Sequence, residues 1–266
     1  MRLTALVIAF LSVPALAAAS PCHSFVQHWP GGGVQVASLE GMALAQAEPR
    51  VDIAYVAHST FRIETPAGVS IATDFFGAAG GDTPTIVTMN HAHETHWTPN
   101  PDPGITHVLR GWKTGGQAVH YLDVEDVVVR NVPTDLRSFG FEANGNSIFI
   151  FEIGQLCIGH LGHLHHEPSE EQYAAIGRLD VVMAPVDGTF TLNLGQMINV
   201  LKRLKSRVVL PMHAFSRFGL EQFLAGMAEE FEIEFHQGPI TVAADALPAQ
   251  PTVMVLNEGA FPRGFD

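Results

Sequence analysis

Basic side chains are scarce in this chain. Its 266 residues include 14 Lys and Arg against 27 Asp and Glu, which gives a formal net charge of −13 at pH 7. A surface with this imbalance repels phosphate backbones and anionic lipid headgroups, so neither nucleic acid nor a membrane surface is expected as a partner. Charged residues make up only 15% of the chain and hydrophobic residues 47%. This composition is typical of a globular protein that buries one large core.

Cysteine is nearly absent as well, because only Cys22 and Cys157 occur. A disulfide between them would close a long loop and would stabilise the fold by about 4–5 kcal/mol in the chain-entropy model. Cys157 lies three residues before His160 in a predicted strand, and this odd offset puts the two side chains on opposite faces. The sequence therefore disfavours Cys157 as a metal ligand. It favours a disulfide, in an oxidising compartment, without deciding it.

Long apolar runs are missing except at the N-terminus. Arg2 precedes a nearly continuous apolar stretch, Leu3 to Leu16, and Ala15-Leu16-Ala17 fits the cleavage site of an export signal. Pro14 and the short length argue against a membrane span, with an uncleaved anchor as the alternative. We expect residues 1–19 to be a signal peptide. The mature protein is then periplasmic or secreted, and free of the membrane.

The rest of the chain predicts one α/β domain. Residues 20–49 are poorly patterned and are expected to lead into a domain over residues 50–266. Short β-branched runs come first, and helical patterns then alternate with strands, which predicts a layered sandwich of sheets and helices. A capping box at Ser169–Gln172 opens the first predicted helix. The predicted strands are 51–56, 60–64, 69–73, 85–89, 106–110, 124–132, 147–152, 155–159, 180–184 and 207–211, with a turn at 144–146 and helices at 169–176, 194–205 and 220–230.

Three imidazoles follow the strand at 85–89 within six residues. The segment reads His91-Ala-His93-Glu-Thr95-His96. His91 and His93 point to the same side of an extended chain, and His96 returns to that side if the chain turns. Neutral imidazole nitrogens at this spacing suit zinc or a neighbouring transition metal. An exposed polar loop that happens to contain histidine is the alternative reading.

Two further predicted strands also end in histidine. His160 ends the strand at 155–159 and is followed by His163, while His213 follows the strand at 207–211. Loops at strand ends are where α/β folds assemble their sites. A single such histidine is more often a structural residue, but three sets indicate a shared metal centre. The candidate ligands are His91, His93, His96, His160, His163 and His213.

The order and spacing of these residues resemble the metallo-β-lactamase-fold hydrolases, whose signature is H-x-H-x-D-H, a later H-x-G-D and a final His. Upstream, His58 and Asp74 lie in segments similar to those of the branch that includes ascorbate-6-phosphate lactonase. The resemblance runs from about residue 51 to 214. It implies a four-layer αβ/βα sandwich, one or two zinc ions or another transition metal, and hydrolysis of a substrate that the motif does not identify.

Two positions depart from the family pattern. Thr95 stands at the position of the family's ligand aspartate, and His163 at that of the bridging aspartate. The family geometry then implies a first site of His91, His93 and His160, and a second site of His96, His163 and His213. Two dications about 3.5 Å apart repel by on the order of 20 kcal/mol at an effective dielectric constant of about 20. Without anionic ligands, the second metal is expected to be weak or absent.

Four other residues are candidates for roles at this centre. The Thr95 hydroxyl can orient a water but cannot act as a base near neutrality. Asp74 can hold the other nitrogen of a ligand histidine, or can be a turn or cap residue. Asp187 precedes Gly188 and is more typical of a turn. His58 can border the pocket, or can be a hydrogen-bonded structural residue.

These observations predict an exported, metal-dependent hydrolase that uses a metal-bound hydroxide on a small ester, lactone or phosphoester. The alternative is a histidine-rich protein on the same fold that binds zinc, copper or nickel without catalysis. A third possibility is an interaction module that has lost its chemistry. The expected partner is a small-molecule substrate, and the oligomeric state stays open.

Overall fold

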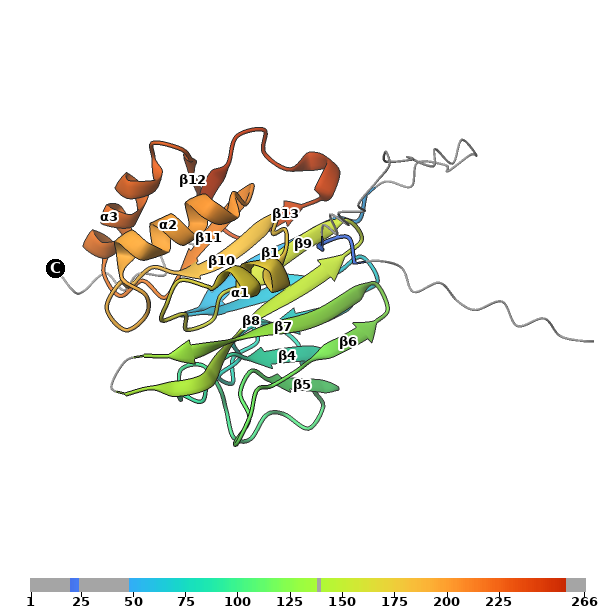
Figure 1. Ribbon diagram of the computed structural model, residues 1–266. Helices are drawn as coiled ribbons and strands as arrows, with labels where there is room; N and C mark the ends of the chain where they lie inside the picture. Colours follow the sequence, from blue (N-terminus) through green and yellow to red (C-terminus); the bar gives the residue numbers. More distant parts are fainter. Residues whose placement is uncertain (1–19, 24–47, 138–139, 257–266) are drawn as a thin grey trace, which may run out of the picture.

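Two β-sheets lie against each other across the main hydrophobic core (Figure 1). The structure is a computed structural model that describes residues 20–23, 48–137 and 140–256. The expected signal peptide and most of the expected lead-in lie outside the described residues. The first sheet has the order β13 (Ile240–Val242), β1 (Val51–Ala57), β2 (Thr60–Glu64), β3 (Ser70–Ala72), β4 (Ile86–Met89) and β5 (His107–Arg110).

The second sheet is larger, with eight strands. Its order is β12 (Glu232–His236), β14 (Thr252–Leu256), β11 (Val208–Met212), β10 (Val181–Pro185), β9 (Leu156–His160), β8 (Glu142–Ile153), β7 (Val127–Leu136) and β6 (Tyr121–Val124). Three helices pack on its outer face, as Figure 1 shows: α1 (Glu170–Ile176), α2 (Leu194–Leu204) and α3 (Arg217–Met227). The α/β sandwich expected from the sequence is confirmed.

Apolar side chains divide between the faces of the sheets. Phe61 and Phe149 belong to the core between the sheets, while Met197 and Phe223 from the helices pack against the second sheet. The outer face of the first sheet carries a smaller cluster that includes Phe75, and most of the residues that pack against it come from loops. Within the described residues, the helices therefore cover one outer face and loops cover the other.

Strand direction gathers several chain turns at one edge of the sandwich. Strands β9, β10 and β11 are parallel, and so are β3, β4 and β5. Because β1 and β3 are both antiparallel to β2, the end of β1 lies on the same side as the end of β3. In such sheets ligands bind beyond the carboxyl ends of the strands. The histidines predicted after these strands are therefore candidates to meet.

Several element boundaries differ from the sequence prediction. The predicted strand 124–132 is divided by a tight turn in which Glu125 has a φ of 52°, so that it becomes β6 and β7. The predicted turn at 144–146 lies inside β8, where Asn144 has a φ of 57°. The strands β12, β13 and β14 were not predicted. Sequence patterns miss these features because pairing with a neighbouring strand, and not local propensity, decides them.

A disulfide between Cys22 and Cys157 attaches the N-terminal segment to β9, as the sequence favoured. The carbonyl oxygen of Cys22 accepts a hydrogen bond from Arg178 N–H at 2.9 Å, just after α1. Ser20 Oγ donates to the carboxylate of Glu152 at 2.9 Å. Residues 20–23 are thus held by covalent and polar contacts. Over the part of the chain that the structure describes, the helices are too short or too polar to cross a bilayer.

Candidate metal centre

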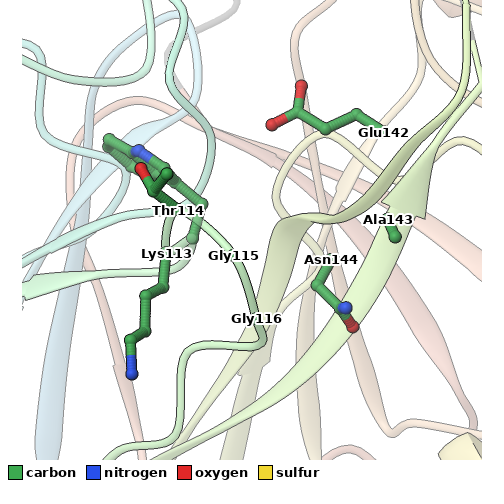
Figure 2. A pocket seen from close by; sticks show the side chains of 8 residues that line it. Lys113, Thr114, Gly115, Gly116, Glu142, Ala143 and Asn144 are labelled. Carbon is green, nitrogen blue, oxygen red and sulfur yellow. The ribbon is translucent and has the colours of Figure 1, made fainter.

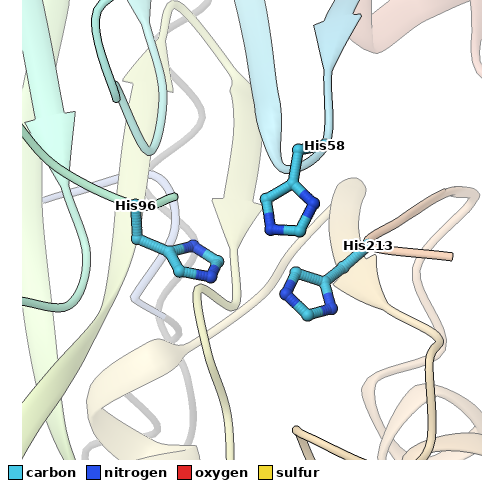
Figure 3. Close-up of side chains that lie close together, drawn as sticks. All are labelled: His58, His96 and His213. Carbon is cyan, nitrogen blue, oxygen red and sulfur yellow. The ribbon is translucent and has the colours of Figure 1, made fainter. Parts of the chain in front are cut away.

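Three histidines from distant parts of the chain meet at the shared strand edge (Figure 3). His58 lies in the turn between β1 and β2, His96 in the loop after β4, and His213 directly after β11. Their ring centroids are 4.2 Å (His58 to His213), 5.1 Å (His58 to His96) and 5.2 Å (His96 to His213) apart. One nitrogen from each ring lies within 4.8 Å of the other two. We refer to these residues as the histidine trio.

Two buried carboxylates orient two of these rings. His96 Nδ1 donates to Asp74 Oδ2 at 2.5 Å, and His213 Nδ1 donates to Asp187 Oδ1 at 2.9 Å. A proton held on Nδ1 leaves the lone pair on Nε2, which is the usual arrangement of a metal-binding histidine. Asp74 is itself held by the backbone N–H of Asn90 at 3.1 Å. The carboxylates thus fix both the tautomer and the ring orientation.

The unpaired nitrogens of the trio fit a metal ion. Nε2 of His58 and Nε2 of His96 are buried and have no hydrogen-bond partner among the described residues. A buried polar atom without a partner costs about 1–3 kcal/mol, so such atoms need an explanation. Zinc–nitrogen bonds of about 2.0–2.1 Å place tetrahedral ligand atoms about 3.4 Å apart. The trio's nitrogens, all within 4.8 Å of one another, form an all-nitrogen donor set that suits zinc.

Further histidines continue the cluster on one side. The ring centroid of His163 lies 4.7 Å from that of His96, 5.1 Å from that of His213 and 5.4 Å from that of His91. His93 is 6.0 Å from both His91 and His96. All the predicted ligands except His160 therefore lie in one group, which also contains His58.

The Nδ1 atoms of these additional rings also have hydrogen-bond partners. His91 Nδ1 donates to the carbonyl oxygen of Gly145 at 3.2 Å. His93 Nδ1 lies 3.0 Å from Thr95 Oγ1, and His163 Nδ1 lies 2.7 Å from His165 Nε2. Thr95 thus contacts a histidine of the cluster, and its expected part in catalysis stays a prediction.

His160 has a different place from the one expected. Its Nε2 donates to the carbonyl oxygen of Ser59 at 2.8 Å, and its Nδ1 accepts from the N–H of Gly162 at 3.1 Å and lies 3.2 Å from Nδ2 of Asn90. Both ring nitrogens are therefore used by protein groups, and the side chain is fully buried. The structure does not bring His160 together with His91 and His93 as the expected tri-histidine site. It brings His58 to the cluster instead.

Burial keeps several of these rings neutral. Burial, together with the electrostatic influence of the neighbouring His213 and His96, lowers the pKa of His58 to about 3. Burial also lowers the pKa of His91 to about 4 and that of His163 well below its usual range. For Asp74, burial raises the carboxyl pKa, but the charge and hydrogen bond of His96 outweigh this and leave the pKa lowered. Neutral imidazole is the form that binds metals.

Three residues of the centre have unusual backbone conformations. His58, Asp74 and His213 have φ angles of 52°, 46° and 55°, a region that residues other than glycine rarely adopt. Each such residue costs on the order of 1–3 kcal/mol, and such residues concentrate at functional sites.

For His58 and Asp187 the sequence signal was present in their positions at strand ends. Local pattern alone could not show that they face His213.

A cavity of about 500 Å³ is formed by the loop after β5 and the start of β8 (Figure 2). Its lining includes Trp112, Lys113, Glu142 and Asn144. Asn144 directly precedes Gly145, whose carbonyl oxygen orients the His91 ring. None of the predicted ligands lines this cavity, so it is a neighbour of the centre and not the centre itself.

Comparison with known proteins gives a family and a fold. A family model described as a β-lactamase superfamily domain matches residues 52–213. A UPF0173 metal-dependent hydrolase of Pyrococcus abyssi is 30% identical over 112 residues, which are 41% of this chain and 50% of that protein. The chain thus spans about half the length of this curated relative.

Two solved structures share the fold at low identity. A Thermotoga maritima protein, described as a Zn-dependent hydrolase of the metallo-β-lactamase superfamily, has a TM-score of 0.59 and 23% identity, over 77% of this chain and 98% of that one. A metallo hydrolase of Ignicoccus hospitalis has a TM-score of 0.52 and 17% identity, over 68% and 91%. These similarities agree with the two-sheet architecture.

Proposed function

Because this chain belongs to the metallo-β-lactamase superfamily, we propose that it is a metal-dependent hydrolase whose reaction centre is the histidine cluster. The observation that carries this proposal is the histidine trio, in which Asp74 and Asp187 hold Nδ1 while buried Nε2 atoms of His58 and His96 stay unpaired. Zinc is the metal that we propose, since imidazole nitrogens suit it. A divalent ion bound there supplies Lewis acidity and a nucleophile that works at neutral pH.

The residues around the trio bind, orient and hold protons. Asp74 and Asp187 keep a proton on Nδ1 of His96 and His213 and place negative charge behind both rings. They partly compensate for the carboxylates that Thr95 and His163 replace. The Thr95 hydroxyl can orient a polar group but cannot accept a proton near neutrality. The proposed reaction is hydrolysis of a small ester, lactone or phosphoester: the oxygen of water bonds to the carbonyl carbon or phosphorus, the bond to the alkoxide oxygen breaks, and the alkoxide leaves as the alcohol with a proton from the water.

A metal-dependence assay tests this proposal. Protein treated with a chelator is measured on p-nitrophenyl acetate, a γ-lactone and bis-p-nitrophenyl phosphate, before and after zinc is returned. We expect turnover only with metal, and a loss of at least about 100-fold in His96→Ala and His213→Ala. The matched control is His236→Ala, because His236 pairs with Glu234 on β12. Metal-independent turnover, or turnover that survives both ligand variants, would contradict the proposal.

A non-catalytic metal-binding protein is the second candidate. It is favoured by the all-nitrogen character of the cluster, which lacks the two aspartates that the resembling family carries. Tight zinc uptake without turnover on any of the three substrates would support it. The same preparation tests the metal stoichiometry. We expect one tightly bound ion per chain, and two tightly bound ions would refute a mononuclear centre.

Export to the periplasm or the medium is also part of the proposal. The disulfide between Cys22 and Cys157 supports it, because such bonds persist in oxidising compartments. Mass spectrometry of the mature protein from fractionated cells tests it. We expect an N-terminus near residues 18–20. A chain that begins at residue 1 in the cytosolic fraction would refute export.

A further inference from the structure

Two exposed phenylalanines lie beside the histidine trio. The ring centroid of Phe215 is 4.7 Å from that of His213 and 5.7 Å from that of His58. Phe190 meets Phe215 edge-on at 5.6 Å. Phe190 is 54% exposed and Phe215 is 53% exposed. Exposed apolar side chains that lie together, next to a polar centre, mark a surface that contacts another molecule.

The position of Phe190 is linked to that of a trio residue. The carboxylate of Asp187 accepts hydrogen bonds from the backbone N–H groups of Thr189 (2.8 Å), Phe190 (2.5 Å) and Thr191 (3.2 Å). The same carboxylate orients the ring of His213 at 2.9 Å. One side chain therefore sets both the tight turn that carries Phe190 and the ring that faces the metal centre.

The position of Phe215 is equally constrained. It lies between His213 and Ser216, and the side chain of Ser216 caps the N-terminus of α3. Phe215 is therefore held between a trio residue and a capped helix. Aromatic residues that are fixed before binding lose little conformational entropy when they contact a ligand.

We propose that Phe190 and Phe215, the aromatic pair, bind an apolar alkyl or aryl group of the substrate next to the metal centre. This inference rests on the proposed function and narrows it. The substrate is an ester or lactone whose polar, scissile group lies at the histidine trio, and its hydrophobic portion packs on the aromatic pair. Small polar esters, which cannot reach the pair, are poorer substrates.

A chain-length series of esters tests this assignment. The kcat/KM of the zinc-loaded enzyme is measured on p-nitrophenyl acetate, butyrate, hexanoate and octanoate. We expect the octanoate-to-acetate ratio of kcat/KM to fall at least about tenfold in Phe190→Ala and in Phe215→Ala. In these variants the additional CH₂ groups of the longer acyl chain lose their apolar contact with the removed ring. The matched control is Phe235→Ala, since Phe235 is 51% exposed on the edge strand β12. That variant keeps the wild-type ratio.

Binding of octanoate and acetate, measured by calorimetry, separates this inference from the proposed function. Suppose that no ester is hydrolysed, but that octanoate binds at least about tenfold more tightly than acetate and loses this preference in Phe190→Ala and Phe215→Ala. The hydrolase proposal then fails and the apolar subsite stands. If esters are hydrolysed without dependence on chain length, the subsite is refuted and the hydrolase stands. Sedimentation of the same variants is the last check. A dimer that Phe190→Ala dissociates, with the chain-length ratio unchanged, would assign the pair to self-association and overturn the inference.

Discussion

The hydrogen-bond partners of the Nδ1 atoms decide what the histidine cluster can bind. Asp74, Asp187 and the carbonyl oxygen of Gly145 each accept a hydrogen bond from Nδ1–H of one ring. The Nε2 lone pairs are then left for a shared ligand. In His160 both nitrogens are used within the protein, and the ring becomes part of the scaffold. The same side chain therefore serves two purposes, which only its hydrogen-bond partners distinguish.

The variant Asp74→Asn tests the orienting role of this carboxylate. Loss of the negative charge weakens the hold on His96 Nδ1, and the single amide oxygen can accept from either Asn90 N–H or His96 Nδ1–H but not from both, so the ring is held less firmly. We expect zinc affinity to fall about 10–100-fold in a competition titration with a chromophoric chelator. Asp245→Asn, in the distant 3₁₀ turn Ala244–Ala246, is the control. Equal affinity in the two variants would contradict the role.

The variants His58→Asn and His160→Asn test which of these two histidines is a metal ligand and which is a structural residue. Asn tolerates the positive φ of His58, and removal of an unpaired buried nitrogen offsets the loss of the ring contacts with His96 and His213, so the unfolding free energy of the metal-free protein should change by less than about 1 kcal/mol. His160→Asn disrupts buried hydrogen bonds and should cost about 2–4 kcal/mol. Urea unfolding measures both. Zinc affinity should fall more than tenfold in His58→Asn, and the reverse pattern would show that His160 is the ligand.

At the scale of elements, the carboxyl ends of parallel strands position the centre. The prediction that strands at 85–89, 155–159 and 207–211 end near histidines agrees with β4, β9 and β11. These strands were predictable because their β-branched runs are buried and continuous. The extension of β8 past Asn144 was not predictable, since Asn and Gly are typical of turns and the pairing with β7 overrides that preference.

The connection after β9 offers a sharp test at this scale. Gly162 has a φ of 61°, and a Cβ there would lie 2.4 Å from Asn146 Oδ1 and 2.7 Å from Asn90 Nδ2. Gly162→Ala should therefore cost about 2–5 kcal/mol of unfolding free energy. Gly115 has a φ of 73° with open space around it, so Gly115→Ala should cost only about 1 kcal/mol. Equal losses in urea unfolding would contradict the crowding at Gly162.

For the whole molecule, the neutral buried histidines predict acid sensitivity. The pKa values of His58, at about 3, and His91, at about 4, are lowered by burial, while an unfolded histidine has a pKa of about 6.5. At pH values between the folded and unfolded pKa, the unfolded chain therefore binds more protons than the folded one. The free energy of unfolding is thus highest above about pH 6.5 and falls as the pH drops toward 4. We expect the Tm of the metal-free protein to decrease over this range. A Tm that stays constant from pH 7.5 to 4.5 would contradict the burial of neutral rings.

The family motif, the α/β class, the metal-centre hypothesis and the favoured pairing of Cys22 with Cys157 followed from the amino-acid sequence. They are encoded in residue types and spacings, which need no coordinates to be recognised. Tertiary structure alone decided that His58 joins His96 and His213, that His160 does not, and that Asp187 links His213 to Phe190. These contacts join segments far apart in the chain. Their geometry depends on how the two sheets pack, which no local pattern contains.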